Sequence, residues 1–85
     1  MDRKEVYSRI DTERDYQDLI WSGHTHEVGA YITMLRHYVT KAEQAWTENQ
    51  GDTPALDVIR KITAIGVHCM EEHGVPERII DANIR

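Results

Sequence analysis

The segment from residue 53 to residue 73 carries an apolar surface too wide for one neighbouring helix to cover. Asp52 or Thr53 can cap it as a helix, Pro54 suits its first turn, and Gly74 ends it. Its apolar stripe consists of Ala55, Val58, Ile59, Ile62, Ile65, Gly66 and Cys69, widened by Leu56, Thr63, Val67 and Met70. This arc exceeds half of the circumference. Either the N-terminal segment folds over it or another subunit does.

The segment from residue 26 to residue 48 has a second helical pattern of apolar residues, and this helix can pack against the 53–73 helix. Its apolar positions are Val28, Tyr31, Ile32, Leu35, Tyr38, Val39, Ala42, Ala45 and Trp46. Gly66 costs the 53–73 helix about 1 kcal/mol in propensity, which a close helix crossing offsets. Residues 2–20 favour a third helix with only a thin apolar stripe. We therefore predict an all-α fold: a long antiparallel helical hairpin plus an N-terminal helix, oligomerising, as a single domain over residues 1–85.

Length and charge narrow the classes of function. The chain has 85 residues, a net charge of −5 and one cysteine, Cys69, so no disulfide can form within one chain. No apolar run approaches the roughly 20 residues of a membrane span, and the charged N-terminal stretch lacks the apolar core of a signal peptide. We expect a cytoplasmic protein that binds neither a membrane nor a DNA or RNA duplex.

The stretch "GHTHEVGAY", residues 23 to 31, raises the question of a metal site. His24 and His26 form an H-x-H pair, and Cys69 and His73 are four residues apart on one helix. Both spacings suit zinc, but no convincing further ligands accompany them. We favour a helix start with Thr25 as the N-cap, a core position for Cys69, and no metal or other cofactor.

Aromatic and basic residues near the same stretch suggest a site for a small anionic ligand. All aromatic residues are Tyr or Trp, which combine a stacking surface with a polar group. Tyr31, Tyr38 and Trp46 are predicted to be core residues. The candidate ligand-binding residues are Tyr16 and Trp21 for stacking, Arg14, Arg60 and Lys61 for phosphate, and His24, Thr25 and His26 for hydrogen bonds.

Several stretches resemble a family of small all-α proteins encoded by bacteriophages and prophages. They are "ERDYQDLIW" (13 to 21), "HTHEVGAYITML" (24 to 35), "ALDVIRKITAIGVHCMEEHG" (55 to 74) and the following "VPER". The hairpin is also similar to the MazG-type nucleotide pyrophosphohydrolases, in which E-x-x-E and E-x-x-D helices hold magnesium. Here Trp46 follows Glu43 at the third position, and Arg60 follows Asp57, so those acids are missing. A MazG-type site that lacks those acids can hold a nucleotide, but we do not expect it to hydrolyse the nucleotide well.

The resemblance implies a non-enzymatic role. Phages encode small helical oligomers, called sponges, that sequester the signalling nucleotides of the CBASS and Thoeris immune systems, and this chain resembles them in its general features. We therefore expect a phage protein that binds a cyclic oligonucleotide or an ADP-ribose-type signal in the host cytoplasm. One alternative is a magnesium-dependent (d)NTP pyrophosphohydrolase with Glu43, Asp57 and Glu72 as metal ligands. Another is an adaptor that binds a host protein through the wide apolar helix face.

Overall fold

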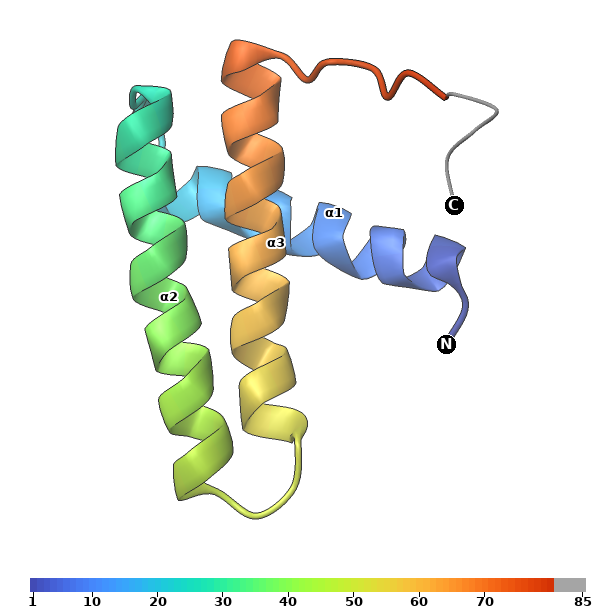
Figure 1. Cartoon of the computed structure of the whole chain (residues 1–85), viewed down its shortest axis with the longest axis vertical. Helices are drawn as coiled ribbons and strands as arrows, with labels where there is room; N and C mark the ends of the chain where they lie inside the picture. The colour runs from blue at the N-terminus through green and yellow to red at the C-terminus, as the bar shows by residue number, and fades with distance from the viewer. Residues whose placement is uncertain (81–85) are drawn as a thin grey trace.

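The computed structural model describes residues 1–80, which form three α-helices and no strand (Figure 1). Helix α1 spans Arg3–Ile20, α2 spans Val28–Glu48 and α3 spans Thr53–His73. The predicted all-α class is confirmed, and the predicted bounds of the last helix agree with the structure. Within residues 1–80, none of the helices combines the length and the hydropathy that crossing a membrane requires.

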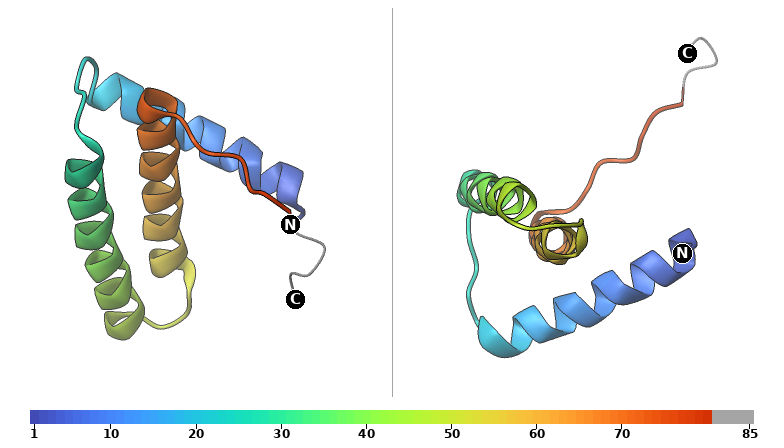
Figure 2. Two further views of the ribbon diagram at one scale, coloured as in Figure 1. Left: turned by 45° about the horizontal axis from the view of Figure 1, so that its top comes forward. Right: turned by 90° about the horizontal axis from the view of Figure 1, so that it is seen from below.

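Helix α3 is the central element, because both α1 and α2 pack on it. In both figures α2 and α3 lie side by side and run in opposite directions, joined by the loop of residues 49–52 (Figures 1 and 2). Their contact buries Tyr31 and Ile65, each only 1% exposed. Gly74 ends α3 as predicted: its φ is 85°, and its N–H donates to the Met70 carbonyl at 2.8 Å.

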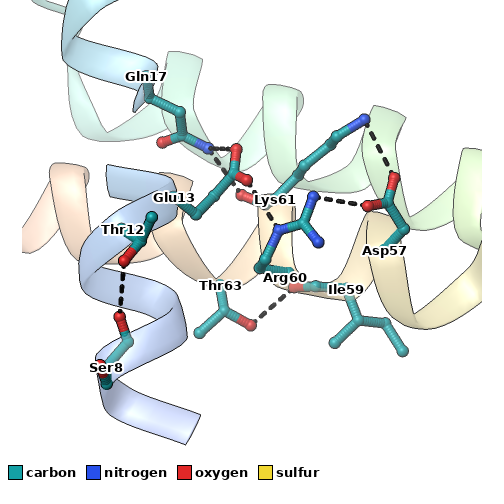
Figure 3. Close-up of polar contacts among 9 residues, drawn as sticks. All are labelled: Ser8, Thr12, Glu13, Gln17, Asp57, Ile59, Arg60, Lys61 and Thr63. Atoms are coloured by element: carbon teal, nitrogen blue, oxygen red, sulfur yellow. Dashed lines mark hydrogen bonds and ion pairs between the residues drawn. The ribbon is translucent and has the colours of Figure 1, made fainter. Parts of the chain in front are cut away.

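Helix α1 crosses α3 at a steep angle and is held there by polar groups (Figures 2 and 3). Arg60 Nε donates to Glu13 Oε1 at 2.8 Å, and Gln17 Nε2 donates to the Lys61 carbonyl at 3.2 Å. Glu13 and Gln17 are both buried. Because the helices meet only where they cross, the thin apolar stripe of α1 stays outside the contact, and Leu19 is 82% exposed.

Two core predictions are wrong. Trp46 is 61% exposed, and its indole N–H donates to Asp52 Oδ1 at 3.3 Å instead of packing in a core. Its position on α2 is the reason: Trp46 lies on the exposed side of the helix with Val39, about 60° around α2 from Tyr31 at 100° per residue. Cys69 is half-buried, not fully buried.

Candidate functional site

The loop of residues 21–27 folds back over the contact between α2 and α3. The Trp21 N–H donates to the Gln17 carbonyl at 2.8 Å and ends α1. Gly23 then turns the chain with a φ of 78°, which favours glycine, and the His24 N–H donates to the Trp21 carbonyl at 3.2 Å. This tight turn places Trp21, His24 and His26 beside the two helices.

The prediction that Thr25 caps α2 is wrong, because the helix begins two residues later than expected. Glu27 is the N-cap residue, in an extended conformation and without a side-chain capping bond. The end of α3 holds the preceding backbone outside the helix. Glu72 Oε2 accepts from the His26 N–H at 3.4 Å, and His73 Nε2 lies 2.7 Å from the His26 carbonyl oxygen.

Glu72 is the centre of a polar cluster between the loop, α2 and α3. Its Oε1 accepts from the Tyr31 hydroxyl at 2.6 Å and lies 2.9 Å from His68 Nε2. The hydrogen bond from Tyr31 lowers the pKa of the Glu72 carboxyl, and the His26 N–H and the rings of His68 and His73 add to that effect. Burial, and then the bond to Glu72, raise the pKa of the Tyr31 hydroxyl.

Histidine rings surround Tyr31 edge-on. The ring of His26 lies 5.3 Å from it, that of His68 5.6 Å and that of His73 6.2 Å, measured between centroids. His24 lies 6.5 Å from His26. Four of the five histidines thus share one site, but they pack against a phenol ring placed between them. Across residues 1–80, no three His, Cys, Asp or Glu side chains are arranged to hold a metal ion.

Acid is expected to weaken the fold partly through Glu72. Its pKa is lower in the folded chain than the usual 4.5, so its contribution is present above that value and is lost as the pH falls through the folded value. Asp57, whose carboxyl accepts from Arg60, acts in the same direction. Glu72→Gln should therefore flatten the fall in the free energy of unfolding below about pH 4.5, measured by urea denaturation at stepped pH.

The matched control for this prediction is Glu77→Gln, on the exposed stretch after α3. That variant should follow the pH dependence of the unmodified chain. Equal acid dependence of the Glu72→Gln variant and the unmodified chain would contradict the assignment of Glu72 as an acid-sensitive group.

Two adjoining cavities lie over α3, between α1 and α2. The first has a volume of about 360 Å³ and is lined by Trp21, His24, His26, Tyr31, Met34, Tyr38, Ile65 and His68. The second has a volume of about 310 Å³ and is lined by Glu13, Tyr16, Ile20, Trp21, Tyr38, Lys41, Val58 and Lys61. Trp21 and Tyr38 belong to both linings, so the two cavities adjoin at this pair of rings. We call them together the aromatic cleft.

Five of the eight predicted ligand-binding residues line the aromatic cleft: Tyr16, Trp21, His24, His26 and Lys61. Thr25 instead faces a separate hollow beside Glu72 and His73, and Arg60 lines another beside Arg9.

The sequence prediction did not include Lys41 and His68 among the residues that line the cleft. Their spacings were the available signals, because Lys41 follows Tyr38 by three residues and His68 precedes Glu72 by four.

Arg14 lies apart from the cleft and joins helices. It is 6% exposed, and its guanidinium pairs with Glu71 at 2.9 Å and with Asp18 at 2.8 Å. Burial lowers the pKa of Arg14, but the hydrogen bonds to Glu71 and Asp18 outweigh it and raise the pKa above its usual value. These contacts give Arg14 a clear part in fixing α1 on α3, and its role as a phosphate ligand stays a prediction.

The carboxylates of the magnesium alternative do not converge within the chain. Asp57 and Glu72 are fifteen residues apart on α3, which separates them by about 22 Å at 1.5 Å per residue. Asp57 pairs with Arg60 at 2.6 Å and with Lys61 at 3.4 Å, while Glu72 is held by Tyr31. One cation cannot bind both groups of the same chain.

Comparison with known proteins adds no relative. No family model matches the chain, and neither the curated proteins nor the solved structures contain a significant match. The resemblance to phage proteins therefore stays a prediction, and the geometry of the aromatic cleft is the main evidence on function.

Proposed function

We propose that the protein binds a small nucleotide in the aromatic cleft without reacting with it. The observation that supports this most directly is that Trp21 and Tyr38 line both cavities, and that two lysines line the second. A volume of about 300–1,000 Å³, mostly apolar with a few convergent polar groups, is typical of small-molecule sites. The chain offers such a site although its net charge is −5.

The two cavities suit different parts of a nucleotide. In the first, the rings of Trp21 and Tyr38 offer stacking faces for a base, and His24 and His26 offer hydrogen-bonding groups. In the second, Lys61 and Lys41 supply positive charge for phosphate, and Lys41 Nζ lies 5.4 Å from the centroid of the Tyr38 ring. A base in the first cavity and phosphate in the second matches the chemistry of both.

Sequestration is the role that we propose for this binding. Groups suited to hold a nucleotide converge in the cleft, whereas Asp57 and Glu72, two of the three acids needed for magnesium-dependent hydrolysis, lie far apart on α3. On this proposal the protein is a phage-encoded sponge that removes an immune signalling nucleotide from the host cytoplasm. No cofactor is required, because binding alone lowers the free concentration of the signal.

Truncating Trp21 is expected to weaken ligand binding about tenfold to 100-fold. The reason is that stacking of one base on an aromatic ring contributes about 1–3 kcal/mol. The measurement is isothermal titration of the chain with cyclic di- and trinucleotides, cyclic ADP-ribose isomers and nucleoside triphosphates, followed by Trp21→Ala with the ligand that binds best. Trp46→Ala is the matched control, since Trp46 is exposed and lines neither cavity.

Three outcomes would contradict the proposal. The first is the absence of binding heat with every member of the panel. The second is pyrophosphate release from a dNTP panel with Mg²⁺ or Mn²⁺, which would establish the enzyme instead of the sponge. Equal losses in Trp21→Ala and Trp46→Ala would place the ligand outside the aromatic cleft.

A further inference from the structure

Helix α2 carries an apolar stripe that no other part of residues 1–80 covers. Its members Val28, Ile32, Val39 and Trp46 are 46%, 59%, 45% and 61% exposed. With Leu35 and Ala42 they recur at alternating intervals of four and three residues. This spacing is the heptad pattern by which one helix packs along another. Since α2 turns a different stripe toward α3, the exposed stripe has no partner among the residues that the structure describes.

Helix α3 carries a second uncovered stripe of the same kind. Leu56, Ile59 and Met70 are between 43% and 58% exposed, and Thr63 and Gly66 fill the positions between them. Nothing lies within 4 Å of the place where a Cβ on Gly66 would stand. A glycine in mid-helix costs stability and suits a close helix approach, but none of the described helices approaches Gly66 in this way.

The two stripes share one face of the α2–α3 pair, the face opposite α1. On α3, Arg60 and Glu71, which bind α1, lie about 80° and 100° around the helix from the centre of the stripe, at 100° per residue. On α2, Tyr38 and Lys41, which line the cavity beside α1, lie about 80° and 140° from the centre of the stripe there. The residues that face the neighbouring helix lie between these two sides on both helices. Figure 2 shows α1 on one side of the pair, with no helix on the other.

We infer that a second copy of this chain covers the shared face, which we call the open face, and that the two hairpins form a four-helix bundle. The exposed area supports a partner of this size. The chain exposes 7107 Å², whereas a compact monomer of 9.9 kDa is expected to expose about 5,200 Å². The tail after Gly74 accounts for part of the excess. The open face adds to it, and obligate dimers bury about 1,000–2,500 Å² of each partner.

Charge beside the open face favours a second copy over an unrelated partner. Arg36 and Glu43 lie seven residues apart on α2, along the outer edge of the stripe, and both are exposed. A two-fold axis across the middle of α2 sets α2 antiparallel to the α2 of the other copy. Arg36 of each copy then lies beside Glu43 of the partner subunit. The charges along this edge of α2 are therefore complementary to those on the same edge of a second copy, as an interface with two-fold symmetry requires.

Light scattering coupled to gel filtration tests the interface. The unmodified chain is expected to be a dimer at micromolar concentration. Ile32→Lys, which places a charge on the open face, should weaken the dimer roughly 100-fold or more while keeping the helical circular dichroism spectrum. Leu19→Lys is the matched control: Leu19 is an equally apolar, highly exposed residue of α1, outside the open face, and its replacement should leave the dimer intact.

A charge exchange tests the orientation. Arg36→Glu should weaken the dimer about fivefold, and combining it with Glu43→Arg should restore the affinity, because the pairs re-form with reversed sign. A monomeric unmodified chain at 100 µM, at the order of concentration where weak dimers form, would overturn the inference and leave the open face to a different protein. A dimer that survives Ile32→Lys would overturn it as well. The open face and the aromatic cleft lie on opposite sides of α2 and α3, so each proposal can fail without the other.

Discussion

Replacing Tyr31 by Ala is expected to lower the free energy of unfolding by about 3–5 kcal/mol, the usual cost of truncating a buried aromatic residue. Tyr31 is 1% exposed and is the largest fully buried side chain. It joins α2 to α3 both by packing and by its 2.6 Å hydrogen bond to Glu72. A domain this small has little stability beyond that loss. Chemical denaturation followed by circular dichroism should therefore show a largely unfolded variant at 37 °C.

Two companion variants separate the packing of Tyr31 from its hydrogen bond. Tyr31→Phe keeps the ring and removes only the hydroxyl, and its cost should be about 1–2 kcal/mol because Glu72 is left without that donor. Tyr7→Ala truncates a tyrosine that is 65% exposed on α1 and should change stability by less than about 0.5 kcal/mol. Similar losses in Tyr31→Ala and Tyr7→Ala would show that Tyr31 is not the centre of the core.

Replacing Ile65 by Ala is expected to cost about 2–3 kcal/mol, in the lower half of the range for buried isoleucine. Ile65 is 1% exposed but also lines the aromatic cleft. The space left by its side chain therefore joins an existing cavity that opens to water, so the penalty for an enclosed void is reduced. Urea denaturation gives the free energy, and Ile65→Val should cost only about 1 kcal/mol.

Ile79→Ala provides the control for Ile65. Ile79 follows α3 and is 87% exposed, so the same truncation there should leave the denaturation midpoint unchanged. If Ile65→Ala also left the midpoint unchanged, Ile65 would not pack between α2 and α3 in solution.

The features that sequence predicted well are local. The start and end of α3 follow from Pro54 at the first turn and Gly74 at the last, which act through their own backbone. Periodicity identified both long helices, because a helical face repeats over positions close in sequence. The structure places Tyr16, Trp21 and Lys61 on the lining of one cavity, because Trp21 immediately follows α1 and the turn keeps it nearby. Their role as ligand-binding residues stays a prediction.

The features that sequence missed depend on contacts between distant segments. Thr25 has the chemistry of an N-cap, but Glu72 and His73, more than 40 residues later in the chain, hold the backbone of His26 outside the helix. Sequence alone also could not reveal that Arg14, predicted as a phosphate ligand, pairs with Glu71 of α3; its role as a ligand stays a prediction. A prediction from neighbouring residues alone could not reveal these contacts with distant parts of the chain. For the same reason Trp46 was predicted to be a core residue, although the core does not extend to it.

The central position of α3 has a consequence for how the chain folds during synthesis. Both α1 and α2 pack on α3, and the ion pair between Arg14 and Glu71 joins residues 57 positions apart. Neither of the first two helices has its packing surface until α3 has left the ribosome, so folding has to wait for the last of the three. Their apolar residues meet solvent or chaperones during that interval. The many charged groups of α1, which are well hydrated without a partner, suit a segment that emerges first and docks last.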